Sequence, residues 1–243
     1  MTLISAARLR GRTHERCDDR FFFQKHAEWH VAALCDGAGS QPLASVGARL
    51  ASREACRLIP ELLKEGPGNE ADVKRDLSPL PTLLRLEVLK RFWPALGLVS
   101  IGDFAATLLF AAYHLPSRRW LVGHIGDGVV SGIDRGRVLT LSHPQNGEFA
   151  NTTHFFTDHS AQGHMRLACF DDLDGVALMS DGTAKTFYRA DDGASSDALK
   201  RLFAWQKELG EAKGSSVLRK NLSAFALPKT GDDCAMLLMQ RAK

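Results

Sequence analysis

Apolar and polar positions follow two patterns along the chain, and these predict two kinds of element. Short continuous apolar runs are typical of buried strands, whereas apolar residues at helical spacing are typical of amphipathic helices. We expect strands at residues 3–10, 21–23, 30–36, 104–113, 119–125, 129–133, 137–141, 163–170, 175–179 and 234–240. We expect helices at 43–64, at 83–93, from 183 onward with an apolar stripe over 198–209, and at 216–225.

The segments between these elements are more polar. Thr82 is the expected N-cap of the helix at 83–93, and Pro94 is expected to close it. Residues 69–81 are expected to be irregular or partly helical, and residues 143–161 to form a long loop or flap.

The order of the elements indicates the fold class. Strands come first, followed by helices, a run of strands, more helices and a final strand, and this segregation favours α+β over a doubly wound parallel sheet. Two packed antiparallel sheets flanked by pairs of helices would bury both kinds of apolar stripe. We find no internal repeat or linker, so we expect a single domain over residues 1–243.

Composition narrows the class of partner. An apolar content of 44% supports a sizeable core, and a net charge of +3 with scattered Lys and Arg argues against a nucleic-acid surface. No apolar run is long enough to span a bilayer, and residues 1–10 lack the apolar core of a signal peptide. Five cysteines without zinc-like pair spacing favour free thiols in a reducing cytoplasm.

Carboxylates adjoin apolar strand-like runs at four places. Asp36, Asp127 and Asp181 each follow such a run and precede a glycine, and Asp232 precedes the last run. A single Asp-Gly pair is usually a turn, but the recurrence places several acids at strand ends. Hard cations such as magnesium and manganese prefer oxygen ligands of this kind.

The polar loop over residues 11–20 concentrates Arg12, His14, Arg16, Asp18 and Asp19. It is either a solvated turn or a basic anion-binding group beside carboxylates directed at a metal. The sequence contains neither an HExxH motif, which argues against zinc, nor a GxxxxGK[ST] loop, which argues against a P-loop nucleotidase. Metal-dependent hydrolysis of a phosphate ester is the function these residues favour.

The ordered set of acidic motifs resembles the PPM/PP2C family of metal-dependent protein serine/threonine phosphatases, and in particular a bacterial PP2C-like subgroup. The resemblance covers residues 11–240. It rests on Asp18-Asp19-Arg20-Phe21, Asp36-Gly37-Ala38-Gly39-Ser40, Gly47-Ala48, Thr107-Leu108-Leu109, Gly126-Asp127-Gly128, Ser180-Asp181-Gly182 and Asp232-Asp233-Cys234-Ala235.

The resemblance implies a two-metal centre, usually manganese or magnesium, with a bridging hydroxide as the nucleophile that attacks phosphorus. By position, Asp36 would bridge both ions and the Gly37 carbonyl would bind one of them. Asp181 and Asp232 would bind the other ion. Asp18 or Asp19 would act through water, and Asp127 would help to hold a third ion.

The sequence also departs from the family pattern. The usual phosphate-binding Arg is absent from its standard place, where His14 stands between Arg12 and Arg16. These three residues are the candidates for holding phosphate. Either His14 or metal-bound water would then protonate the leaving group.

Two further departures lie near the Asp-Gly turns. Ser40 stands near the place where some members carry a His general acid, and Lys185 stands where some carry an Asp for the third metal. His124 and His154 are interpreted as structural, because a histidine in a strand is more often a packing residue than a ligand.

Three functions are therefore compared. The first is hydrolysis of phosphoserine or phosphothreonine in cytoplasmic proteins, with a kinase or its targets as partner. The second is a catalytically weak or inactive module of the same fold that binds phosphoprotein or regulates a kinase. The third is an enzyme acting on small phosphate esters or nucleotides.

Overall fold

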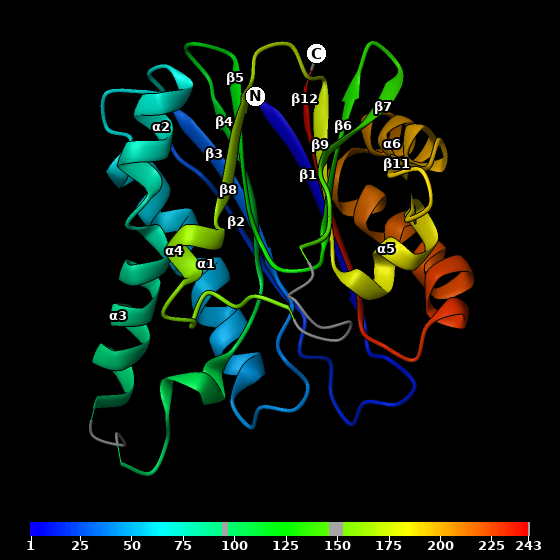
Figure 1. Ribbon diagram of the computed structural model, residues 1–243. Helices are drawn as coiled ribbons and strands as arrows, with labels where there is room; N and C mark the ends of the chain where they lie inside the picture. Colours follow the sequence, from blue (N-terminus) through cyan, green and yellow to red (C-terminus); the bar gives the residue numbers. More distant parts are fainter. Residues whose placement is uncertain (94–96, 146–152, 243) are drawn as a thin grey trace.

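Two five-stranded antiparallel sheets pack face to face, and helices cover their outer faces (Figure 1). The computed structural model describes residues 1–93, 97–145 and 153–242. The first sheet has the order β1 (Thr2–Leu9), β12 (Cys234–Arg241), β9 (Gly175–Met179), β6 (Val129–Asp134), β7 (Arg137–Ser142). The second has the order β2 (Arg20–Lys25), β3 (Trp29–Cys35), β4 (Leu108–His114), β5 (Arg119–Ile125), β8 (Arg166–Phe170). The predicted fold class is confirmed.

The helices form two outer layers, one on each sheet. The second sheet is covered by α1 (Ala44–Leu62), α2 (Glu70–Leu77) and α3 (Leu80–Phe92). On the first sheet lie α5 (Asp181–Phe187) and α6 (Ala198–Asn221), which continues into a π-turn η3 (Leu222–Ala226) and a 3₁₀ turn η4 (Leu227–Lys229). Smaller elements are η2 (Ile101–Phe104), α4 (Ala161–His164) and the pair β10 (Tyr188–Arg189) and β11 (Ala194–Ser195).

Three apolar clusters fill the spaces between the layers. One lies between the sheets and contains Leu34, Trp120 and Leu178. The other two lie between each sheet and its helices. Every residue of β3 and β9 is buried because both faces of these strands are covered. This explains why their sequences are continuous apolar runs rather than alternating ones.

Several predicted boundaries are wrong, each for a local reason. The helix α3 starts at Leu80 with Pro79 as N-cap, so Thr82 is not the N-cap. Pro81 stands in the first turn of the helix, where proline fits because its missing N–H costs no hydrogen bond. The expectation that residues 69–81 are partly helical, by contrast, is confirmed: residues 70–77 form the helix α2, which begins with a capping box between Asn69 and Asp72. Residues 101–104 form η2, so the following strand begins at Leu108 rather than at residue 104.

Three more differences concern the second half of the chain. The two helices expected around 198–225 are the two arms of α6, which a non-helical backbone at Gly210 (φ of 77°) separates, but the second arm begins before residue 216 and ends at Asn221. The helix expected from 183 begins at Asp181, and the strand expected from 163 begins at Arg166 after the short helix α4. Of the expected flap at 143–161, residues 146–152 lie outside the described residues.

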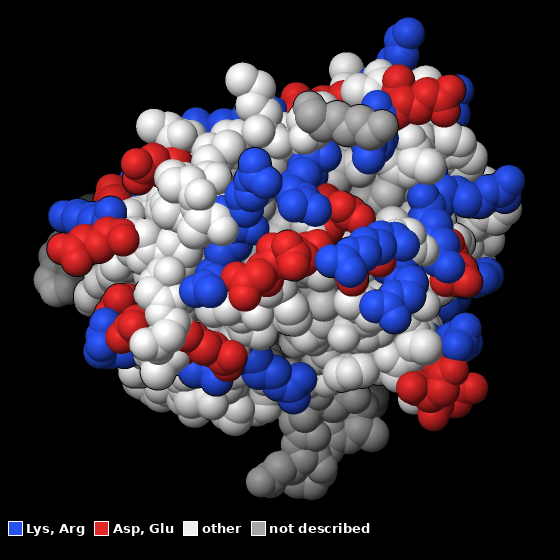
Figure 2. All heavy atoms as spheres, turned by 90° about the horizontal axis from the view of Figure 1, so that it is seen from above, with Lys and Arg blue, Asp and Glu red and all other residues white. Residues whose placement is uncertain are grey.

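One end of the molecule carries the termini, and the opposite end carries the acidic motifs. Both termini lie at one end, where basic and acidic side chains intermingle and the described residues of that face form no broad patch of one sign (Figure 2). The loops that carry the acidic motifs gather at the opposite end (Figure 1). Within the described residues, no helix is long and apolar enough to cross a membrane.

Candidate active site

The acidic strand ends converge on one cleft between the two sheets. The cleft has a volume of about 200 Å³. It is lined by His14, Asp36, Gly37, Ala38, Gly39, Thr107, Asp127, Thr153, Phe155, Asp181 and Asp232. Larger hollows occur elsewhere on the surface, but this is the one where the predicted carboxylates meet.

Asp36 is fixed at the end of β3 by its own backbone. Its N–H donates to Thr107 Oγ1 at 2.9 Å, and its carbonyl accepts from the Thr107 N–H at 2.8 Å. The next residue, Gly37, packs so closely on α1 that a Cβ there would lie 2.9 Å from the Ala44 carbonyl carbon. The Asp-Gly turn therefore holds the carboxylate at the cleft. Burial, and then the nearby Asp19, raise the pKa of Asp36 well above its ordinary value.

Asp19 is fully buried next to Asp36. Its Oδ2 accepts a hydrogen bond from Ser180 Oγ at 3.0 Å, whereas its Oδ1 has no hydrogen-bond partner among the described residues. Burial is the main cause that raises the pKa of this carboxyl to about 8. A buried carboxylate that lacks a partner is costly unless a cation or a proton neutralises it.

Asp181 and Asp232 form the side of the cleft next to α5. Lys185, one turn further along α5, places Nζ 3.2 Å from Asp181 Oδ2 and 3.8 Å from Asp232 Oδ2. The other oxygen of Asp181, Oδ1, is buried and has no hydrogen-bond partner among the described residues. Burial and the charge of Asp181 raise the pKa of Asp232.

Asp127 occupies the turn between β5 and β6. The preceding Gly126 has a φ of 114°, and a Cβ there would lie 2.5 Å from Thr107 Cγ2, so this position requires glycine. Gln145 holds the turn, since its N–H donates to the Gly126 carbonyl at 2.8 Å. Burial first, and then the charge of Asp181, raise the pKa of Asp127 to about 6.

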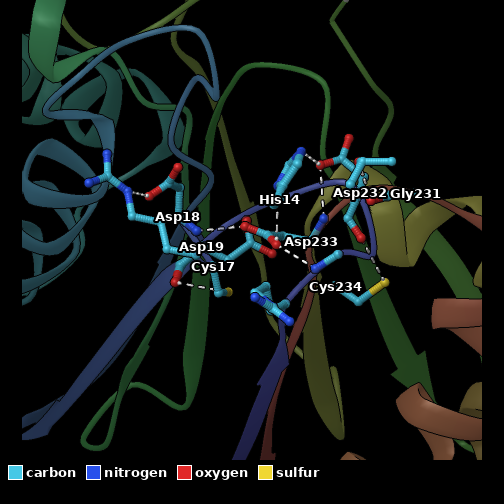
Figure 3. Close-up of polar contacts among 12 residues, drawn as sticks. His14, Cys17, Asp18, Asp19, Gly231, Asp232, Asp233 and Cys234 are labelled. Atoms are coloured by element: carbon cyan, nitrogen blue, oxygen red, sulfur yellow. Dashed lines mark hydrogen bonds and ion pairs between the residues drawn. The ribbon is translucent and has the colours of Figure 1, made fainter.

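His14 brings the polar loop over the final acidic motif (Figure 3). Its Nε2 lies 3.6 Å from Asp232 Oδ1, and its Nδ1 lies 3.2 Å from Asp233 Oδ1. Asp233 ties this loop to the start of β12, because its carboxylate accepts the backbone N–H groups of Gly11 at 2.7 Å and Asp18 at 2.6 Å. The imidazole is thereby held at the edge of the cleft.

The other candidates of the polar loop are placed differently. The Asp18 carboxylate points away from His14 and Asp232 (Figure 3) and pairs with Arg16 Nε at 2.9 Å. Arg16 also donates to the Pro42 carbonyl at 2.9 Å. Neither residue lines the cleft, and neither does Arg12, whose side chain is exposed. The structure thus brings Asp19 rather than Asp18 to the carboxylate cluster.

The donor types suit hard divalent cations, although among the described residues no three His, Cys, Asp or Glu side chains are already grouped as ligands of one ion. Five carboxylates lie in or directly beneath the cleft, and the unpartnered oxygens of Asp19 and Asp181 face no hydrogen-bond donor among the described residues. Burial first, and then repulsion from neighbouring carboxylates, raises the pKa values of Asp36 and Asp232. Oxygen ligands in this number suit magnesium or manganese.

Sequence reasoning missed three supporting residues. Asp233 organises the polar loop, Ser180 donates to Asp19 and accepts the Ala235 N–H at 2.9 Å, and Thr107 holds Asp36. All three stand inside the quoted motifs. Only their partners, which are far away along the chain, reveal their role.

The two histidines that we interpreted as structural each contact another side chain. His124 is buried in β5, and its Nδ1 lies 2.7 Å from Ser142 Oγ. Burial lowers the pKa of His124 to about 3, so it stays neutral. The His154 ring stacks on His164 with 3.5 Å between ring centroids.

The chain is similar to known protein phosphatases. A family model described as Protein phosphatase 2C matches residues 10–225. A curated relative, "Serine/threonine-protein phosphatase 3" of Escherichia coli (strain K12), is 34% identical over 131 residues. That match covers 53% of this chain and 48% of the relative, so it spans about half the length of each.

Solved structures extend the likeness to the whole fold. The serine/threonine phosphatase Stp1 from Staphylococcus aureus superposes with a TM-score of 0.69 at 14% identity, covering 100% of this chain and 96% of that one. PppA, described as a key regulatory component of T6SS in Pseudomonas aeruginosa, gives 0.59 at 17% identity and 99% coverage of both chains.

Proposed function

Because this chain belongs to the protein phosphatase 2C family, we propose that it hydrolyses phosphoserine and phosphothreonine in proteins with the help of two divalent cations, manganese or magnesium. The observation that carries the proposal is the single cleft that Asp36, Asp127, Asp181 and Asp232 line, with Asp19 beneath it. The ions would neutralise phosphate oxygens and lower the pKa of an attacking water.

Each carboxylate has a proposed role in holding the ions. Asp36, at the centre of the cluster, would contact both, with the Gly37 carbonyl beside it. Asp181 and Asp232 would hold one ion, and Asp19 would act on the other from below. Asp127, which also lines the cleft, is proposed as an outer ligand that helps to hold a third ion or as a group that orders water.

The chain's own residues would manage the phosphate and the proton. Attack of water oxygen on phosphorus breaks the bond to the serine or threonine oxygen, which then needs a proton. His14 is proposed as the donor, because Asp232 and Asp233 hold its ring at the edge of the cleft. Because no described lining residue is an arginine, the proposed partners of the phosphate are the His14 ring at the cleft edge and the Lys185 ammonium beside Asp181 and Asp232.

The test of this proposal is hydrolysis of a phosphothreonine peptide by the purified chain with manganese, with magnesium and with a chelator. The proposal requires turnover with metal and loss of turnover in chelator. Turnover of small phosphate esters or nucleotides alone, with phosphopeptides untouched, would contradict the protein substrate and support the small-ester enzyme.

A second candidate function rests on the arginine-free lining of the described cleft. A module of this fold that binds phosphoprotein or regulates a kinase, but does not hydrolyse the phosphate ester, would not need an arginine to stabilise the phosphate during catalysis. Manganese titration by calorimetry separates the two, since an active centre requires at least millimolar binding and the absence of any such site would favour the module.

A further inference from the structure

A groove of about 400 Å³ lies beside the candidate active site, between α5, the first turns of α6 and the turns that follow it. We call it the α5–α6 groove. The residues that carry the argument are Phe187, Arg201, Leu202, Trp205, Phe225 and Lys229.

The floor of the α5–α6 groove is apolar and fixed. Phe187 and Leu202 are buried members of the core under the first sheet, and Trp205 packs against the same core. Phe225, by contrast, is 58% exposed at the rim. An exposed phenyl ring beside an apolar floor is the arrangement that accepts another apolar side chain.

The rim of the groove is basic. Arg201 and Lys229 line it, no acidic residue does so, and neither cation forms an ion pair among the described residues. Elsewhere on α6 a basic side chain does find an acid, as Lys200 Nζ does at 2.8 Å from Asp197 Oδ1. The groove therefore complements a segment that carries negative charge together with an apolar side chain.

Two segments connect the groove to the cleft over a short distance. The helix α5 has Asp181 at the cleft and Phe187 in the groove, a length of about 9 Å at 1.5 Å per residue. Likewise, Lys229 lines the groove and Asp232 lines the cleft. The chain between them advances by three residues, which reach at most about 11 Å. An extended peptide spans this distance in three to four residues, at about 3.3 Å each.

We propose that the α5–α6 groove docks the part of a phosphoprotein substrate that flanks the phosphorylated residue. This segment carries acidic residues and one aromatic or large aliphatic side chain, about three to four positions from the phosphorylated residue. The apolar side chain enters beside Phe225, and the acids pair with Arg201 and Lys229. The inference rests on the proposed phosphatase function and adds a sequence preference to it.

The experiment compares two phosphothreonine peptides with manganese present. One carries an Asp-Glu-Phe segment four residues from the phosphothreonine, prepared on either side, and the other carries Ala in its place. Each is assayed with the full chain, with an Arg201→Gln/Lys229→Gln/Phe225→Ser variant and with an Arg137→Gln/Lys64→Gln control. The small ester p-nitrophenyl phosphate reports on the metal centre, and thermal unfolding reports on folding.

The full chain and the control should prefer the acidic–aromatic peptide by about tenfold in kcat/KM, mostly through KM. The groove variant should lose this preference and keep the p-nitrophenyl phosphate rate. Equal rates on the two peptides, or a preference that survives in the groove variant, would overturn the proposal.

Failure of the phosphatase function would be distinguishable from failure of docking. If no substrate is hydrolysed, fluorescence anisotropy of the labelled peptides still decides whether the groove variant binds the acidic–aromatic peptide more weakly than the full chain. If sedimentation shows instead that the full chain dimerises and the Phe225→Ser variant does not, the occupant is a second copy and the proposal is wrong.

Discussion

At the residue scale, the two oxygens of a cleft carboxylate face different surroundings. Asp181 turns Oδ2 toward the Lys185 ammonium at 3.2 Å, while its buried Oδ1 lacks a hydrogen-bond partner among the described residues. Asp232 turns Oδ1 toward His14 and Oδ2 toward Lys185. The outer side of the cluster thus carries the Lys185 ammonium, and Oδ1 of Asp181 remains available to an ion from solution.

Lys185 should therefore compete with divalent cations for these carboxylates. Lys185→Gln removes a positive charge about 3–4 Å from two carboxylates, so we expect manganese to bind about three- to tenfold more tightly, screened because the lysine is half exposed. Calorimetric titration measures this. Lys200→Gln, which breaks a pair with Asp197, is the matched control. Unchanged or weaker binding in Lys185→Gln would show that the ammonium does not compete.

The cleft residues differ in how far the sequence could predict them. Asp36, Asp127, Asp181 and Asp232 could be found because each abuts an apolar strand, and strand ends converge in a sheet protein. The choice between Asp18 and Asp19 could not be made, because it depends on which side chain turns inward beside Ser180. That orientation is set by β12 and α5, far away along the chain.

At the scale of elements, the close packing of α5 on the start of β12 sets the geometry of the site. Gly182 lies in the first turn of α5, and a Cβ there would lie 2.1 Å from the Asp233 carbonyl oxygen. Asp181 and Asp232 can share one cleft because these two backbones approach so closely. A side chain at this position would push the two ligand-bearing segments apart.

Gly182→Ala should destabilise the fold and weaken metal binding together. We expect a loss of about 1–3 kcal/mol in the free energy of unfolding, the range for overpacking a close contact, measured by urea denaturation. The matched control is Gly163→Ala in α4, where an added Cβ would meet nothing within 4 Å. If Gly182→Ala were as stable as the control, the approach of α5 to β12 would be looser than described.

Element types were more predictable than element ends. The buried strands gave clear signals because both of their faces are covered, as in β3 and β9. The start of α3 and the joining of α6 across Gly210 depend on local capping and on tertiary packing. A pattern of apolar positions does not report these.

At the scale of the whole molecule, the carboxylate cluster links stability to pH and to metal. Burial raises the pKa of Asp19 to about 8 and of Asp127 to about 6, above the value near 4 expected in the unfolded chain. Between about pH 4 and pH 8 the folded state therefore holds protons that the unfolded state has released. The carboxyl groups therefore lower stability without metal as the pH rises through this window, whereas buried His124, whose pKa is lowered to about 3, acts in the opposite direction below about pH 6.5.

Thermal unfolding in chelator should show this fall as a lower melting temperature at pH 8 than at pH 5. Manganese should raise the melting temperature more at pH 8 than at pH 5, because cations bind the ionised carboxylates. A melting temperature in chelator that rises from pH 5 to pH 8 would contradict a buried acidic cluster as the dominant linkage.

The central claim is that Asp36, at the end of β3, and Asp19, buried beneath it, form the core of a catalytic metal centre. The most direct measurement is manganese-dependent hydrolysis of a phosphothreonine peptide by Asp36→Asn, Asp19→Asn and Asp18→Asn, with folding checked by thermal unfolding. The structure predicts that the first two lose at least about a hundredfold in kcat/KM. Asp18→Asn, the same chemical change at a carboxylate that faces Arg16, should stay within about threefold of the unmodified chain. Full activity in folded Asp36→Asn would contradict the account.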